Sequence, residues 1–229
     1  MTWAEEYRAF HERRLAMMVG LLERNVDGAL GRSLDIGGGG DILDLSTVVR
    51  DKFGAETHSV DLGEDVELAR KKGLLSRECD IDKEPLPFDD GYFDLVIFAS
   101  VLEHLYNPRF VLDEIGRIVR PGGLLLLETP NAVSAARRID ALRGRNPFSR
   151  FNEYNAEKNK SRMTHCSVLY TTGEVERLLA RDFTIGDSAY AMHVPPCNIF
   201  KALVRRAVSA FFPGMSDCFA VVARRRGVQ

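Results

Sequence analysis

The sequence predicts an α/β protein built on a parallel, doubly wound sheet, and three observations lead to this expectation. Short apolar runs alternate with segments of helical period over most of the 229 residues, as in repeated strand–helix–strand units. The run YFDLVIFA, residues 92–99, is almost continuously apolar, which is typical of a strand covered on both faces. Polar residues close the predicted strands, at the sheet edge where ligands of such folds bind.

The chain is expected to begin with a helix over residues 3–26, because its aromatic residues recur at helical spacing. RSLDI, residues 32–36, is a short strand that runs directly into four consecutive glycines. A helix over about 42–53 follows. We expect it to stop at Gly54, since glycine readily adopts the left-handed conformation that ends helices.

The second strand and helix are expected at 56–61 and 64–73, and this helix also ends at a glycine. A third strand is expected near 76–81. The prolines and aspartates of residues 82–91 predict a loop before the apolar strand at 92–99.

The next helix is expected at 108–119, and the segment RPGG should break it. LLLLETP, residues 124–130, is the fifth expected strand. Residues 131–165 carry eight basic against three acidic residues, a net charge of +5, and we interpret them as a solvated lid or as a recognition surface for an anionic acceptor. The remaining expected elements are a helix over 171–182 opened by Thr171 or Thr172, a strand over 183–191, a helix over 198–212 and a last strand over 218–225.

The composition argues against several classes of function. A formal net charge of −2 argues against a dedicated nucleic-acid binder, and no apolar run is long enough to span a bilayer. The first residues are charged and helical in pattern rather than signal-like, so a cytoplasmic location is expected. The four cysteines are widely spaced, which favours reduced thiols. No ligand pair has zinc-site spacing, so no metal is expected.

The four glycines at 37–40 predict a close approach of the backbone to a ligand or to the next helix. The dinucleotide motif GxGxxG fails, because Ile42 or Leu43 stands at the position of its third glycine. The phosphate-binding motif GxxxxGK[ST] fails as well, because no lysine with a following Ser or Thr comes directly after the glycines. A strand, an acid, Gly-x-Gly and a helix remain, with a second acid at the end of the next strand.

Four motifs in register, LDIGGGGD, VDLGED, CDIDKEPLPFDDGYFDLVIFASVLEHL and IVRPGGLLLLETPN, resemble the class I S-adenosylmethionine-dependent methyltransferases. The resemblance is closest to the branch that methylates small molecules, quinones, lipids and sugars, and it extends more weakly through residues 164–183. It implies a Rossmann-like sheet of seven mostly parallel strands with an antiparallel last strand and helices on both faces. It also implies one domain, 1–229, made of a helical cover (1–29), a cofactor-binding core (30–131), a basic insertion or lid (132–165) and a C-terminal part of the sheet (166–229).

The resemblance also implies which residues bind the cofactor, S-adenosylmethionine. Gly37 and Gly39 let the backbone approach the methionine portion, and Asp35 accepts a hydrogen bond from its ammonium group, directly or through water. Asp61 takes both ribose hydroxyls, and Asp80 accepts from the adenine amino group. The full expected set is Asp35, Gly37, Gly38, Gly39, Asp61, Leu62, Asp80, Ile81 and Ser100.

The glycine loop departs from the family pattern at one position. The simplest alignment puts Asp41 in the place of the family's third glycine, as the N-cap of the following helix. A deletion that makes Gly40 the third glycine is the alternative.

On the acceptor side, we expect His165 or His104 to act as general base if the acceptor keeps its proton. An alternative role for His104 is to hold its loop together by hydrogen bonds. Asn131, Tyr170 and Arg162 are expected to contact the acceptor. The remaining histidines are expected to be structural or surface residues: His11, His58 and His193.

The expected reaction is O-methylation of a small-molecule or glycan-like acceptor, with S-adenosylhomocysteine as the second product. One alternative is a lipid or quinone methyltransferase at the membrane surface, with peripheral lipid contact through the amphipathic segment 198–212. Another is a catalytically silent partner protein that binds S-adenosylmethionine. The sequence does not specify the oligomeric state.

Overall fold

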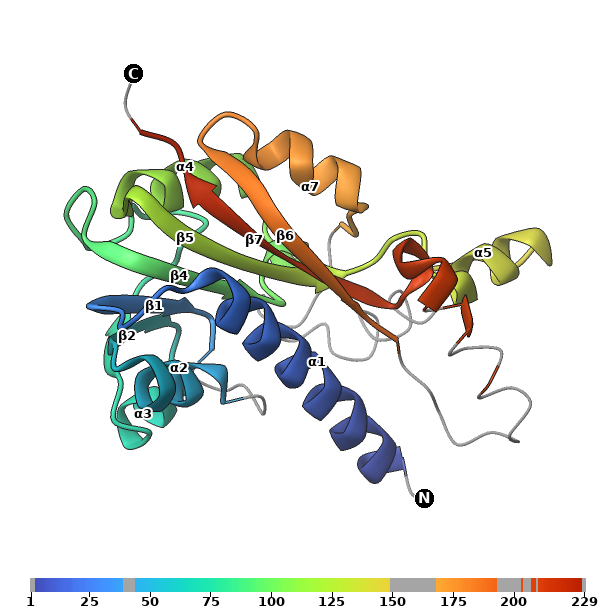
Figure 1. Cartoon of the computed structure of the whole chain (residues 1–229), viewed down its shortest axis with the longest axis horizontal. Helices are drawn as coiled ribbons and strands as arrows, with labels where there is room; N and C mark the ends of the chain where they lie inside the picture. Colours follow the sequence, from blue (N-terminus) through green and yellow to red (C-terminus); the bar gives the residue numbers. More distant parts are fainter. Residues whose placement is uncertain are drawn as a thin grey trace.

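The computed structural model describes residues 3–38, 44–148, 168–192, 203, 207–208 and 210–227. Within these residues seven strands form one sheet in the order β3-β2-β1-β4-β5-β7-β6 (Figure 1). The strands are β1 (Arg32–Ile36), β2 (Glu56–Asp61), β3 (Leu75–Glu78), β4 (Phe93–Ala99), β5 (Val119–Pro130), β6 (Phe183–Ala191) and β7 (Cys218–Arg225). Strands β1 to β5 pair in parallel, and β7 pairs antiparallel with both β5 and β6, which confirms the predicted fold class.

Helices cover both faces of the sheet (Figure 1). Met18 and Leu21 of α1 pack with Val49 of α2 in one apolar cluster, whereas Ile115 of α4 and Val175 of α7 belong to the other. None of the described helices is long and apolar enough to cross a membrane. The helices are α1 (Trp3–Asn25), α2 (Leu45–Phe53), α3 (Glu64–Lys71), α4 (Pro108–Ile118), α5 (Ala135–Leu142) and α7 (Thr172–Leu179), with 3-10 turns η1 (Leu102–His104) and η3 (Pro213–Met215).

The central strands contribute to both apolar clusters, because successive side chains of a strand point to opposite faces. In β4, Val96 and Phe98 pack in the cluster of α4 and α7, while Leu95 and Ile97 pack in the cluster of α1 and α2. The four consecutive leucines at 124–127 of β5 divide in the same way. These strands therefore appear in the sequence as continuous apolar runs.

The RPGG segment requires a correction to the sequence prediction. Helix α4 ends before it, as expected, but RPGG lies inside β5, whose pairing with β4 begins at Val119 and resumes at Leu124 after a shift of register. The intervening residues form an irregularity that needs glycine. Gly122 has φ +75°, and a Cβ on Gly123 would come within 2.8 Å of Val119 Cγ1.

Other boundaries differ from the predictions by a few residues. Strand β3 ends at Glu78, so Asp80 and Ile81 lie in the loop beyond it. Helix α5 lies within the basic segment, for which no helix was predicted. Of the two residues predicted to open the next helix, Thr171 is the N-cap, and it forms a capping box in which Thr171 Oγ1 accepts from Glu174 N and the Glu174 carboxylate accepts from Thr171 N.

Two predictions about helix ends involve residues outside the described ranges. These are Asp41 as the cap of α2, and most of the helix over 198–212. The residue that precedes α2 in the structure is Asp44, which has φ 51° and makes no side-chain cap hydrogen bond.

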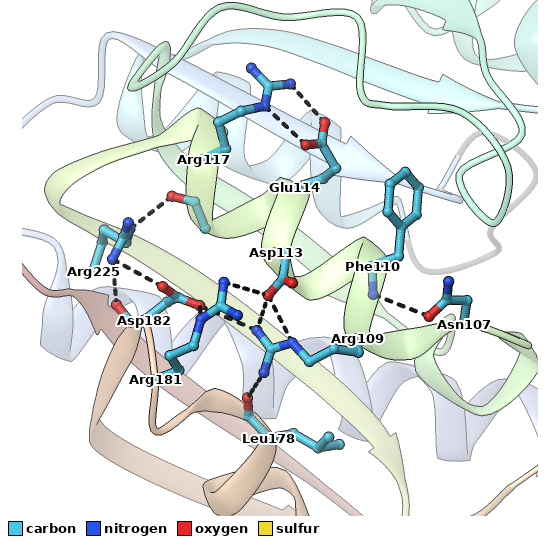
Figure 2. Close-up of polar contacts among 11 residues, drawn as sticks. Asn107, Arg109, Phe110, Asp113, Glu114, Arg117, Leu178, Arg181, Asp182 and Arg225 are labelled. Carbon is cyan, nitrogen blue, oxygen red and sulfur yellow. Dashed lines mark hydrogen bonds and ion pairs between the residues drawn. The ribbon is translucent and has the colours of Figure 1, made fainter.

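A network of ion pairs joins α4 to the residues around β6 and β7 (Figure 2). Arg109 pairs with Asp113 on its own helix and with Asp182, at 3.2 Å. Arg181 reaches Asp113 at 2.8 Å, and Arg225 Nη1 lies 3.6 Å from Asp182 Oδ1. These side chains are partly exposed to solvent, so the network fastens the surface of the fold rather than its interior.

Candidate active site

A cavity of about 510 Å³ opens at the carboxyl ends of β1, β2 and β4. The strand order reverses between β1 and β4, and doubly wound sheets bind ligands at such a point. The wall is formed by these strand ends, the loop after β3, η1 and α1. The lining residues are His11, Arg14, Ile36, Gly37, Val60, Asp61, Leu62, Asp65, Cys79, Asp80, Ile81, Asp82, Ala99, Ser100, Val101, His104 and Leu105.

Most of the residues that the motifs single out for the cofactor meet in this wall. Of the nine expected contacts, Gly39 lies outside the described residues, and Asp35 and Gly38 are buried beside the loop rather than in the wall. The structure thus brings residues from three of the four motifs to one cavity. The expected contacts in the wall are Gly37, Asp61, Leu62, Asp80, Ile81 and Ser100.

The start of the glycine loop has no room for side chains. Gly37 has φ +77°, and a Cβ there would come within 2.8 Å of Val101 Cγ2, so any other residue would be strained. A Cβ on Gly38 would overlap the carboxylate of Asp35, which accepts a hydrogen bond from Ser46 of α2. Asp35 therefore fixes the loop to α2, and its contact with the cofactor's ammonium group stays a prediction.

Two carboxylates of the wall lie at or just beyond the ends of neighbouring strands. Asp61 is the last residue of β2 and is 5% exposed. Asp80 follows β3, and its Oδ2 lies 2.8 Å from Lys83 Nζ. A hydrogen bond of 3.1 Å from Cys79 N to Asp61 O ties the two segments together. Carboxylates beside aliphatic side chains suit a nucleoside, whose hydroxyl and amino groups donate hydrogen bonds while its ring needs apolar contact.

The cavity favours a cationic ligand. Its lining residues include four aspartates and one arginine. Burial, followed by the charges of Glu84, Asp80 and Glu114, raises the pKa of the Cys79 thiol to about 11, so this thiol is neutral at physiological pH. S-adenosylmethionine carries a sulfonium and an ammonium group. Gly37 lines the cavity without a side chain and so leaves room for the methionine portion. The residues of the wall therefore fit this cofactor.

Helix α1 adds a buried arginine that the sequence interpretation did not identify. Arg14 Nε donates to Glu128 Oε1 at 3.0 Å, and Nη2 contacts both Glu128 Oε2 and Ser100 Oγ. Ser100 Oγ donates to Glu128 Oε2 at 3.0 Å, and His11 Nδ1 lies 3.3 Å from Arg14 Nη1. His11, expected to be structural or at the surface, thus lines the cavity. Helical spacing from the buried Met18 places Arg14 on the inward face of α1, a signal that could have identified it.

A second buried carboxyl lies beside this arginine. Glu103 of η1 is 3% exposed and accepts a hydrogen bond from Thr129 Oγ1 at 3.1 Å. Burial, followed by the charge of Glu128, raises the pKa of Glu103 to about 8. Its carboxyl is therefore mostly protonated at neutral pH, and Arg14 balances the charge of Glu128.

The residues predicted for the acceptor side do not all meet in the cavity. His104 lies in its wall. Asn131 and Tyr170 form a bridge between chain segments and are 1% and 8% exposed, and neither lines the cavity. His165 and Arg162 lie outside the described residues. The acceptor contacts of Asn131 and Tyr170 stay predictions.

Comparison with known sequences agrees with this geometry. A family model described as a methyltransferase domain matches residues 7–183. The ubiquinone biosynthesis O-methyltransferase of Xanthomonas oryzae pv. oryzae (strain PXO99A) is 34% identical over 118 residues, 48% of each chain. That of Dechloromonas aromatica (strain RCB) is 30% identical over 132 residues, 55% of each chain. The chain thus matches about half the length of these curated relatives.

Comparison with solved structures supports the same fold. A chain of the complex between the Haloferax volcanii Trm112 methyltransferase activator and the putative methyltransferase gives a TM-score of 0.67 at 15% identity. The match covers 98% of this chain and 95% of that one. The N-methyltransferase NodS from Bradyrhizobium japonicum WM9, in complex with S-adenosyl-L-homocysteine, gives 0.59 at 16% identity, over 95% of this chain and 88% of that one.

Proposed function

Because the chain belongs to the methyltransferase domain family, as a class I S-adenosylmethionine-dependent member, we propose that it transfers a methyl group from S-adenosylmethionine to a hydroxyl oxygen of a small-molecule acceptor. The observation that carries this proposal is the cavity at the strand ends, whose wall includes Gly37, Asp61 and Asp80. An acid-rich, partly apolar cavity of this kind suits a cationic nucleoside.

In this proposal different residues of the wall bind different parts of the cofactor. Gly37 would leave room for the methionine portion, Asp61 would accept from the ribose hydroxyls, and Asp80 would accept from the adenine amino group, and all three residues line the cavity. The guanidinium of Arg14 supplies the positive charge that the methionine carboxylate requires. Its place is fixed by Glu128, so helix α1 takes part in binding rather than only covering the site.

S-adenosylmethionine, when bound, supplies a methyl group whose sulfur leaving group is already activated by positive charge. The protein then has to align the acceptor oxygen with that methyl group and exclude water. As the acceptor oxygen bonds to the methyl carbon, the bond from that carbon to sulfur would break with its electron pair going to the sulfur, and the hydroxyl proton would pass to the proposed base, His104 in the cavity wall. Glu103 is unsuited to this role near neutral pH, because its carboxyl is already protonated. His165 is the alternative base.

The choice of an oxygen acceptor is supported by the curated relatives, which are named ubiquinone biosynthesis O-methyltransferases. The same names favour a second candidate acceptor, a quinone or lipid held at a membrane surface. A glycan-like acceptor is supported only by the TPN motif and the basic segment 131–165. These classes differ in solubility and can be tested separately.

The test is the release of S-adenosylhomocysteine in the presence of phenolic, quinol and sugar acceptors. We expect release with one hydroxyl-bearing class. His104→Ala should lower kcat while leaving the affinity for S-adenosylmethionine unchanged. If cofactor binds but no acceptor releases product, the silent partner interpretation replaces the proposed enzyme. If His104→Ala retains full kcat, this histidine is not the base.

A further inference from the structure

Helix α5 exposes its apolar side chains instead of burying them. None of its residues, all of which are described, is buried, and Leu142 and Ile139 are 88% and 45% exposed. A second exposed pair, Phe211 and Phe212, is 78% and 58% exposed. Single exposed apolar residues are common on protein surfaces, but a group of large ones marks an interaction site.

Hydrogen bonds at Asn131 hold these two segments at one end of the molecule. The Asn131 side-chain Nδ2 donates to Gly214 O and Ser216 O, both at 2.8 Å, just after the phenylalanine pair. The backbone oxygen of Asn131 accepts from Arg137 of α5. Figure 1 shows α5 projecting beyond the end of β5, away from the sheet. We call α5 together with Phe211 and Phe212 the apolar tip.

Within the apolar tip, helix α5 lies in a basic part of the chain, which consists of α5 and the six residues that follow it. Residues 135–148 hold four arginines and one aspartate, a net charge of +3, whereas the whole chain carries −2 and the remainder therefore −5. Arg138, Arg143 and Arg145 are exposed around Leu142. Positive charge and exposed large apolar residues are thus concentrated on the same short segment, on a protein that is otherwise acidic.

We propose that the apolar tip docks on the surface of an anionic membrane. Leucine, isoleucine and phenylalanine side chains would enter the boundary between headgroups and acyl chains, while the arginines meet lipid phosphates. A second copy of the chain is the less suitable occupant, because a two-fold interface sets the same patch against itself and would bring arginines face to face. The charge of the tip matches an anionic lipid surface instead.

Both the apolar side chains of the tip and the arginines around them contribute to docking. A single short helix gives only weak, reversible binding, and basic residues near an anionic surface add to it. Docking should therefore require anionic lipid and weaken as salt screens the arginines. It does not depend on methyl transfer, so the proposal can fail while the proposed function holds, and the reverse.

The test is flotation of the full chain with vesicles of phosphatidylcholine alone or with phosphatidylglycerol added. We expect flotation only with the anionic vesicles, and about a tenfold or greater loss of partitioning for the double variant Leu142→Ser, Phe211→Ser. Both side chains are exposed, so the variant should unfold at the same urea concentration as wild type. Leu68→Ser on α3, which is 42% exposed, is the matched control and should float like wild type.

Three outcomes would overturn the proposal. They are wild-type protein that stays in solution with anionic vesicles, a double variant that floats unchanged, and a dimer that the double variant dissociates. Sedimentation velocity without vesicles distinguishes the last case. Cofactor binding by the double variant, measured in parallel, keeps this result separate from the proposed function.

Discussion

Two arginine–carboxylate networks in this molecule use the same chemistry in opposite surroundings. Beside the cavity, Arg14 and Glu128 have side chains that are 8% and 0% exposed, and the neighbouring Glu103 has no cation of its own in the described contacts. On α4, Arg109 and Asp113 are 39% and 35% exposed, and further arginines join them (Figure 2). The first network has an excess of carboxyl groups, and the second is rich in arginine.

The difference shows that the surroundings of an ion pair, rather than the number of ion pairs, decide how much its loss affects the folded protein. Exposed ion pairs add little to folding stability, because water and salt screen their charges and their long side chains lose conformational freedom. A buried pair contributes little net stability, but the removal of one partner leaves a charge in a medium of low polarity. A buried network that touches a cavity therefore indicates function, whereas the surface network of α4 only fastens elements together.

The largest effect is expected for Arg14→Met, which leaves Glu128 buried without its cation. We expect a loss of about 3 to 5 kcal/mol in the free energy of unfolding, measured by urea denaturation at neutral pH. The double variant Arg14→Met, Glu128→Gln should recover most of this loss, because the orphan charge is gone. A double variant no more stable than the single one would show that the arginine acts by packing alone.

A smaller effect is expected on the pH dependence of the free energy of unfolding, which Glu103 influences. Its pKa is about 8 in the folded protein and 4.5 in the unfolded chain. Between these values the folded protein holds a proton that the unfolded chain has lost. Stability should therefore fall as pH rises from about 4.5 to about 8, by on the order of a few kcal/mol, and level off above that.

Glu103→Gln should remove this slope, because glutamine imitates the protonated carboxyl. Urea denaturation across this pH range, for wild type, Glu103→Gln and the exposed control Glu12→Gln, measures the difference. If the free energies of unfolding of wild type and Glu103→Gln change in parallel with pH, Glu103 does not carry a proton in the folded protein.

The smallest effect is expected for Arg109→Met in the surface network. We expect a change of at most about 1 kcal/mol in the free energy of unfolding, which should shrink further in high salt. Cofactor affinity should be unchanged. A loss as large as that of Arg14→Met would show that the two networks do not differ as described.

The sequence predicted most of the sheet, because the apolar strand runs and the turn residues between them are local signals. Five strands were placed within a residue of their observed limits, but β5 begins earlier, since a register shift in the ladder has no local signature. The cavity residues Gly37, Asp61 and Asp80 lie at or just after strand ends and could be predicted from the motifs. The Arg14–Glu128 pair joins residues 114 positions apart, and only the tertiary packing of α1 brings them together.

Calorimetric titration of S-adenosylmethionine into the protein tests the central claim, that the cavity at the strand ends binds this cofactor. Wild type should bind at submillimolar concentration or tighter, and Asp61→Ala should abolish binding without a loss of folding. Asp51→Ala, which changes an exposed aspartate of α2, should bind like wild type. Absence of binding by wild type, or unchanged binding by Asp61→Ala, would contradict the account.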